Sequence, residues 1–77
     1  GEAADLEIFG VSNAEIAQWI AENTHFDQLI LEFHDYQDPD SGWIHVSYTA
    51  ERPNRGEMLI AEKVDGKTHY SYVESYV

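Results

Sequence analysis

The stretch SGWIHVSYTAERPNRGEMLIAEKVDGKTHYSYV, residues 41–73, carries most of the information about the fold. Residues 43–49 alternate between two faces, which is the period-two pattern of a half-buried strand. A polar loop separates them from a second strand expected at 58–63. Asp65-Gly66 is a strong two-residue hairpin signal and leads to a third strand at 68–73. This part of the chain is therefore expected to form a β-sheet.

The residues before this stretch add two strands and a helix. Residues 4–9 alternate and predict a strand, and the mostly apolar run at 28–34 predicts a central one. Between them, residues 12–15 (SNAE) have the pattern of a capping box that starts a helix at 13–23. The predicted order is β-α-β-β-β-β, an α+β fold in which a single short helix packs on a largely antiparallel sheet of about five strands. Residues 1–77 are expected to form a single domain.

The charge balance limits the classes of partner. Lys and Arg number 4 and Asp and Glu 15, a formal net charge of −11, while 43% of the residues are hydrophobic. Such a chain is acidic without having the composition of a disordered protein. Direct binding to nucleic acid or to an anionic membrane is not expected, whereas a cation, a metal or a basic protein surface is.

The remaining composition excludes several kinds of site. The chain has no cysteine, so disulfides, thiolate zinc sites and thiol nucleophiles are ruled out. No apolar run reaches the roughly 18 residues of a membrane span, and no signal-peptide pattern opens the sequence. We therefore expect a soluble protein of the cytoplasm.

Five segments resemble a known enzyme family when they are taken in order and spacing: GEAADLEIFG, FDQLILEF, SGWIHVSY, NRGEMLIA and DGKTHYSYV. They are similar to the C-terminal half of phage-type peptidase M15 domains, the zinc D-Ala-D-Ala carboxypeptidases and endolysins that act on peptidoglycan. In that family a Ser-x-His-x-x-Gly-x-Ala-x-Asp motif and a later Trp-x-His motif hold the zinc ion. The resemblance implies that Asp5 and His45 are two of its three ligands.

The sequence also departs from the family pattern. The first histidine of the motif lies seven positions before the aspartate, and only four residues precede Asp5, so residues 1–77 correspond to a truncated domain with an incomplete or vestigial zinc site. Many members place an acid three residues before the last histidine, and that position is Gly42 here. Glu32, Asp38 or Asp40 would replace that acid only if the fold brings one of them near His45.

The other histidines are considered as replacements for the missing zinc ligand. His34 would complete a set with Asp5 and His45 if the strands on either side of the DYQDPDSG loop pair across it. His25, after the helix, suits a partner of the helix dipole, and His69 lies beside tyrosines in the last hairpin. For both of these a structural role is the favoured interpretation.

Two functional classes compete. The first is a zinc peptidase whose missing ligand comes from an upstream segment or a partner chain. The second treats the 77 residues as complete: a non-catalytic acidic protein of a phage or mobile element that needs no cofactor. The sequence favours the second class. Its most specific version is an inhibitor of DNA-mimic type, for example an anti-CRISPR protein, that acts in the cytoplasm of a bacterial host cell. There it would bind the basic surface of a host nucleic-acid-binding protein.

The expected binding groups are acids in turns or on strand faces, which would pair with Arg and Lys of the target. Glu15 and Glu22 on the helix are secondary candidates. The tyrosines are expected to form either a further, exposed interface or cross-strand pairs in the last hairpin, and the two interpretations are equally favoured. An edge strand at 68–73 would allow a weak dimer of an otherwise monomeric chain. The proposed partner-binding acids are Asp35, Asp38, Asp40, Glu51, Glu57 and Glu62. The tyrosines are Tyr36, Tyr70, Tyr72 and Tyr76.

Overall fold

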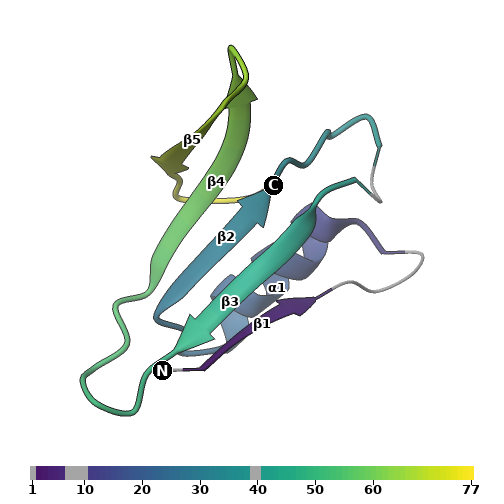
Figure 1. Cartoon of the computed structure of the whole chain (residues 1–77). Helices are drawn as coiled ribbons and strands as arrows, with labels where there is room; N and C mark the ends of the chain where they lie inside the picture. Colours follow the sequence, from purple (N-terminus) through teal and green to yellow (C-terminus); the bar gives the residue numbers. More distant parts are fainter. Residues whose placement is uncertain (1, 7–10, 39–40) are drawn as a thin grey trace.

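The computed structural model describes residues 2–6, 11–38 and 41–77 (Figure 1). One helix lies against a mixed β-sheet, so the predicted α+β class is confirmed. Residues 7–9 of the first expected strand lie outside the described residues. Within the described part, no helix is long and apolar enough to cross a membrane. The elements are β1 (Glu2–Leu6), α1 (Asn13–Asn23), β2 (Gln28–Glu32), β3 (Trp43–Tyr48), β4 (Glu57–Val64) and β5 (Lys67–Tyr72).

The strand order is β1-β3-β2-β4-β5. Strands β3, β2, β4 and β5 form a mixed sheet, and β1 pairs with the outer edge of β3. The central pair, β2 and β4, is parallel, and the other neighbouring pairs are antiparallel. The sheet is therefore largely antiparallel, as expected, but its central pair is parallel, which the sequence pattern did not predict. The reason is the loop after β3, which carries the chain past β2, so that β4 runs in the same direction as β2.

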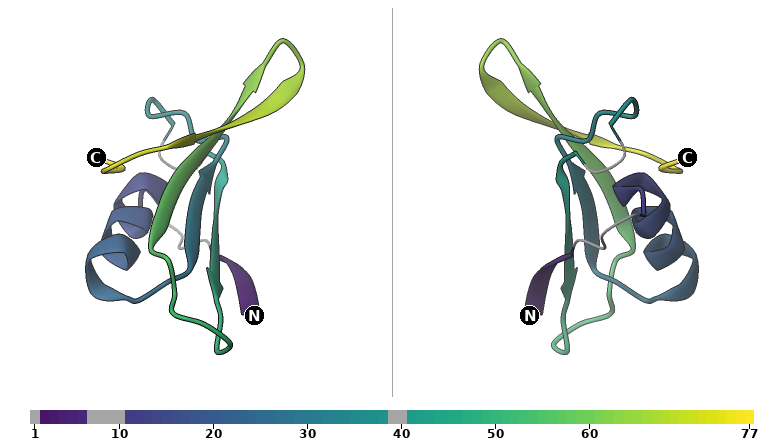
Figure 2. Two further views of the ribbon diagram at one scale, coloured as in Figure 1. Left: turned by 90° about the vertical axis from the view of Figure 1, so that its left-hand side faces the viewer. Right: turned by 90° about the vertical axis from the view of Figure 1, so that its right-hand side faces the viewer.

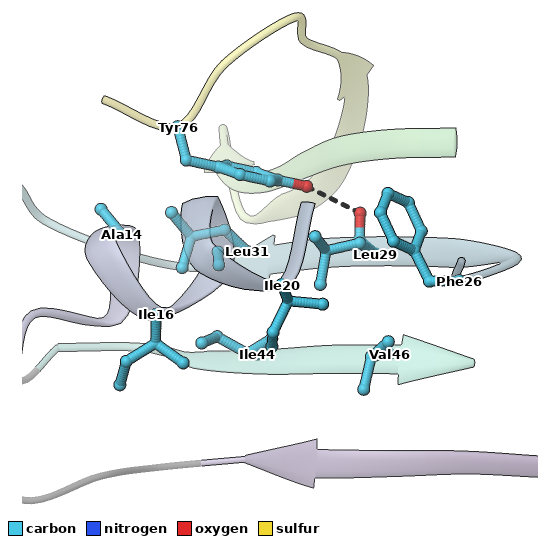
Figure 3. Packing of buried hydrophobic residues seen from close by; sticks show 10 residues of the cluster. Ala14, Ile16, Ile20, Phe26, Leu29, Leu31, Ile44, Val46 and Tyr76 are labelled. Carbon is cyan, nitrogen blue, oxygen red and sulfur yellow. Dashed lines mark hydrogen bonds between the residues drawn. The ribbon is translucent and has the colours of Figure 1, made fainter. Parts of the chain in front are cut away.

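The main core lies between α1 and one face of the sheet, as Figure 2 shows from two sides. Alternate residues of β2 and β3, including Leu29, Leu31 and Ile44, point toward the helix, which presents Ile16 and Ile20 at helical spacing (Figure 3). All five are buried. Apolar side chains repeat every two residues in the strands and every three or four in the helix, and burying both sets fixes which face of each element turns inward.

The helix begins where the sequence predicts, but its start is held differently. Ser12 is the N-cap residue and accepts a backbone hydrogen bond from Ile16 at 3.0 Å. In the described residues its side chain makes no capping hydrogen bond, so the predicted capping box is wrong. Instead, the buried Asn13 donates from Nδ2 to the carbonyl oxygens of Ser41 at 2.9 Å and Gly42 at 3.2 Å. These hydrogen bonds connect the start of the helix to the residues immediately before β3.

A smaller apolar cluster lies on the other face of the sheet, which we call the open face. Ile30, Leu59 and Ala61 are buried there, and Phe33 packs against them. Phe33 follows β2 with a positive φ of 55°, and its ring meets that of Trp43 edge to face at 5.5 Å. The residues of β2 to β5 that share this face by strand alternation and register are Gln28, Ile30, Glu32, Trp43, His45, Ser47, Glu57, Leu59, Ala61, Lys63, Thr68, Tyr70 and Tyr72.

Candidate functional site

The two residues assigned to a zinc site by the resemblance lie on neighbouring strands. β1 and β3 are antiparallel, and their register makes Asp5 the direct partner of His45. His45 is half-buried and belongs to the open face, because its neighbours Ile44 and Val46 point toward the helix. Opposite positions of an antiparallel pair have Cβ atoms about 4.5–5.5 Å apart. The backbone therefore brings these two positions together, although they are forty residues apart in sequence.

The sheet also places an acid beside His45. On the other side of β3, His45 pairs with Ile30 and Trp43 pairs with Glu32. Glu32 is thus the diagonal neighbour of His45 on the open face, at a Cα separation of about 7–8 Å. Of the three acids considered as substitutes in the sequence, Asp38 lies in the loop before β3 and Asp40 lies outside the described residues. Glu32 is the described one that the sheet register brings next to His45.

Position 42, where the resemblance would place an acid, has a backbone conformation that favours glycine. Gly42 has a φ of 68°, a conformation that side-chain-bearing residues rarely adopt. A Cβ atom built on it would collide with the carbonyl oxygen of Glu32 and crowd the backbone of Phe33 and His34. An acid cannot be accommodated at this position without moving the end of β2.

His34 does not complete a metal-ligand set with His45. The residue of β2 opposite His45 is Ile30, whereas His34 lies beyond the end of β2, after Phe33 with its positive φ. Its Nδ1 lies 3.0 Å from the carbonyl oxygen of Ser41, and its ring meets Tyr36 edge to face. The described residues contain no group of three or more His, Asp or Glu side chains placed to hold a metal ion.

The acids expected to bind a partner are divided between the two ends of β3. Asp35 and Asp38 are exposed in the loop that precedes β3, where Ser41 Oγ donates to the carbonyl oxygen of Asp38 at 2.7 Å. Glu51 is exposed in the loop that follows β3, so a strand of about 17–20 Å separates the two groups. Glu62 is exposed on β4. Asp40 lies outside the described residues.

Glu57, the sixth expected acid, is engaged within the chain. Its Oε1 lies 3.2 Å from Nη1 of Arg55 and accepts a hydrogen bond from Gln28, while Oε2 accepts one from Tyr72 at 3.3 Å. Its side chain is only 23% exposed. Glu57 therefore stabilises the start of β4 and offers less of its charge to a partner than the exposed acids do.

A buried carboxylate bound by two arginines was not anticipated from the sequence. Asp27 precedes β2, and its side chain is 8% exposed. Arg52 donates from Nη1 and Nη2 at 2.7 and 3.0 Å, and Arg55 donates from Nε and Nη2 at 3.0 and 3.1 Å. The backbone N–H of Arg55 adds a further bond at 3.1 Å. We call these three residues the Asp27 clamp; it fastens the loop after β3 to the start of β2.

The electrostatics of the Asp27 clamp follow from these bonds. The hydrogen bonds from Arg55 and then Arg52 hold the pKa of the Asp27 carboxyl well below its usual range, although burial alone would raise it. In turn, the pKa of Arg55 is raised by its hydrogen bond to Asp27. The clamp is therefore a charged, structural group, and its carboxylate is already saturated with donors.

The tyrosines divide into exposed and buried ones. Tyr36, Tyr70 and Tyr72 are exposed, in agreement with an interface role, but Tyr76 is only 1% exposed. The Tyr76 hydroxyl donates to the carbonyl oxygen of Leu29 at 2.8 Å (Figure 3). It also accepts a hydrogen bond from the N–H of Leu59 at 3.1 Å. Including Tyr76 in the exposed set was therefore wrong. The residues after β5 turn back across the helix side of the sheet, and this ring closes the core.

Comparisons with protein-family models, with curated proteins and with solved structures found no match for this chain. The relationship to M15 peptidases therefore stays a prediction that rests on the quoted sequence segments.

Proposed function

We propose that this domain supplies two ligands, Asp5 and His45, to a zinc-dependent peptidase site on the open face of the sheet. The observation that carries the proposal is the β1–β3 register, which makes these two positions direct partners. The resemblance selects the same two residues from sequence motifs, without any knowledge of strand pairing. Two motifs distant in sequence thus meet at one place in the fold.

The residues present fit part of such a site. Carboxylate and imidazole are both ordinary zinc donors, and a catalytic site has three protein ligands with an open position. The described residues contain no group of three candidate donors. The third ligand in this proposal therefore comes from outside the described residues.

Each residue has a distinct role in the proposed site. A zinc ion bound there would polarise the peptide carbonyl and lower the pKa of a bound water. Glu32 lies diagonally from His45 on the same face and takes the part of the acid that the family places at position 42. Its carboxylate would accept a proton from the attacking water and pass it to the leaving amine. Trp43, 43% exposed, borders the same site.

Zinc binding tests the proposal directly. Native mass spectrometry of the product of the intact gene, in zinc-containing buffer, is expected to show one bound zinc ion. Because His45 supplies a ligand, His45→Ala is expected to abolish that binding. Glu32→Gln should retain the zinc and lose hydrolysis of peptidoglycan stem peptides, since the charge that accepts the proton is removed.

His25→Ala is the matched control, because His25 is exposed and lies beyond the end of α1. It should bind zinc like the parent chain. Zinc binding that survives in His45→Ala, or that is lost equally in both variants, would contradict the assignment. Circular dichroism of each variant distinguishes a lost ligand from a lost fold.

A second function is supported by a different observation, the uneven distribution of charge. Of the four basic side chains, Arg52 and Arg55 are bound to Asp27, and Lys63 and Lys67 lie in the β4–β5 hairpin. The exposed Asp35, Asp38 and Glu51 lie in the loops before and after β3, outside that hairpin, although Lys63 Nζ lies 5.7 Å from the centre of the Phe33 ring, two residues before Asp35. This arrangement would suit a cytoplasmic inhibitor of DNA-mimic type, such as an anti-CRISPR protein, whose carboxylates occupy the basic groove of a host nucleic-acid-binding protein.

Salt dependence separates this second function from the first. Displacement of DNA from purified host DNA-binding proteins should weaken steeply as NaCl is raised, because the attraction is between exposed charges. Asp35→Lys with Asp38→Lys should reduce it further, whereas Gln37→Lys in the same loop adds a positive charge without removing an acid and should have a smaller effect. Displacement that does not change with salt would contradict the DNA-mimic proposal.

A further inference from the structure

The outer edge of β5 is the most exposed strand surface of the domain. All six residues from Lys67 to Tyr72 are exposed, and Tyr70 and Tyr72 are 60% and 71% exposed. β5 pairs with β4 on one side, and no strand of residues 2–6, 11–38 and 41–77 pairs with its other side. Figure 2 shows that the β4–β5 hairpin extends beyond the helix and the other strands.

The hydrogen-bonding groups on this edge can be identified from one bond. The N–H of Val73 donates to the carbonyl oxygen of Met58 at 3.0 Å, so Val73 points its backbone groups toward β4. Successive residues of a strand point these groups to alternate sides. Tyr72, Tyr70 and Thr68 therefore direct their N–H and C=O groups outward, away from β4. These backbone groups can form the hydrogen bonds of a β-ladder with a further strand.

We propose that this edge is an interface between two copies of the chain, which pair their β5 strands antiparallel around Tyr70. Only one register of this antiparallel pairing places all three outward-pointing residues of one copy opposite those of the other. In that register the two-fold axis passes through the Tyr70 pair. Tyr70 then faces Tyr70, and Tyr72 faces Thr68. About six backbone hydrogen bonds form between the copies.

The side chains suit this register. Aromatic–aromatic and aromatic–β-branched pairs are favourable cross-strand neighbours, and the Tyr70 and Tyr72–Thr68 pairs are of these kinds. On the other face, His69 lies opposite Ser71 and Lys67 opposite Val73, so no like charges face one another. A register centred on His69 would instead place the two imidazoles opposite each other and pair only two outward-pointing residues of each copy.

Charge favours a second copy over a basic peptide as the occupant. The strand KTHYSY contains one lysine and no acid, whereas the whole chain carries −11. A basic segment would meet Lys67 and gain little at this edge. Two copies bring together their least acidic strands, and the projecting hairpin keeps their acidic bodies apart. The interface is smaller than the roughly 1,000 Å² of a stable complex, so the dimer is weak and depends on concentration.

Sedimentation equilibrium over a range of concentrations tests the proposal. A monomer–dimer equilibrium is expected, and dimerisation should increase several-fold between about 0.05 and 0.5 M NaCl because salt screens the repulsion between the acidic bodies. Tyr70→Pro should abolish it, since the lost N–H points away from β4 and belongs to the central pair. Ser71→Ala is the control and should dimerise normally. A chain that stays monomeric under all conditions, or a dimer that Tyr70→Pro leaves intact, would overturn the proposal.

Cross-linking tests the register without requiring proline in a strand. The chain contains no cysteine, so each introduced thiol is unique. Oxidation of a mixture of His69→Cys and Ser71→Cys chains is expected to yield mainly the mixed disulfide, because these positions face each other at a Cα separation of about 4.5 Å. Predominance of the His69→Cys homodimer would overturn the register centred on Tyr70.

Discussion

Arg55 donates two parallel hydrogen bonds to Asp27, from Nε to Oδ1 at 3.0 Å and from Nη2 to Oδ2 at 3.1 Å. The two residues are 28 positions apart, and the contact joins the end of the loop after β3 to the start of β2. Bidentate arginine–carboxylate pairs combine strength with a fixed geometry. The contact therefore orients the loop from which β4 enters its parallel pairing with β2.

Replacing the carboxylate of this pair should destabilise the fold more than replacing an exposed one. In Asp27→Asn the two guanidiniums keep a neutral partner that can accept only at one atom, and their charges are no longer balanced. We expect a clear fall in the midpoint of thermal unfolding, measured by circular dichroism. Glu51→Gln, in the same loop region and exposed, is the control and should unfold close to the parent chain. Equal midpoints for the two variants would contradict a stabilising role for the clamp.

The same carboxylate should make stability depend on pH in the acid range. Because the pKa of Asp27 is lowered in the folded chain, its stabilising contribution is complete above the unfolded-state pKa of about 3.9 and is lost as the pH falls through the lower, folded pKa. Urea unfolding between about pH 5 and pH 2 should show this loss in the parent chain. Asp27→Asn should show a flatter dependence. An identical pH dependence in both chains would mean that Asp27 is not the group responsible.

The start of α1 offers a comparison between two adjacent residues. Ser12→Ala removes a side chain that makes no capping bond and should change the free energy of unfolding by less than about 0.5 kcal/mol. Asn13→Ala leaves the carbonyl oxygens of Ser41 and Gly42 without their donor and should destabilise by about 1–3 kcal/mol. Urea titration of both variants measures the difference. A larger effect at Ser12 would restore the capping-box interpretation.

Local patterns predicted the elements of this fold better than their pairing. The helix bounds Asn13–Asn23 match the prediction, and the buried Ile16 and Ile20 lie one helical turn apart. The strands β2 to β5 lie within two residues of the predicted ranges. The parallel pairing of β2 with β4 was missed, since a period-two pattern identifies a strand without identifying its neighbour.

The candidate site depended on information that local patterns do not contain. Sequence motifs selected Asp5 and His45, but only the register makes them partners and brings Glu32 beside His45. The Asp27 clamp was missed because its arginines lie 25 and 28 residues away in a polar loop that looked fully exposed. Tyr76 was misjudged because a tyrosine near a chain end carries no periodic signal of burial.

Gly42 should be far less replaceable than Gly56, although the two share a backbone conformation. Their φ angles are 68° and 67°. An alanine at either position would therefore adopt the left-handed conformation, which destabilises the fold by about 1–2 kcal/mol. At Gly42 the new Cβ also collides with the end of β2, whereas at Gly56 nothing lies within 4 Å. Gly42→Ala should therefore lower the free energy of unfolding by at least about 1 kcal/mol more than Gly56→Ala. Equal losses in a urea titration would mean that β2 moves freely away from position 42.

The hydroxyl of Tyr76 should matter as well as its ring. It satisfies backbone groups of both central strands, with the carbonyl oxygens of Leu29 and Leu59 at 2.8 and 2.9 Å and the N–H of Leu59 at 3.1 Å. Tyr76→Phe keeps the ring and leaves these groups without the hydroxyl, so a loss of about 1–3 kcal/mol is expected. Tyr76→Ala also empties part of the core and should lose about 3–5 kcal/mol. Tyr36→Phe is the control: it removes the hydroxyl of an exposed tyrosine, which donates to the Tyr76 carbonyl oxygen at 2.8 Å, and it should lose less than Tyr76→Phe.

Burial raises the pKa of Tyr76, so its contribution is complete below about pH 10 and declines as the pH rises through the folded value. Alkaline unfolding that begins at lower pH in the parent chain than in Tyr36→Phe, or a Tyr76→Phe variant as stable as the parent, would contradict this account of the two central strands.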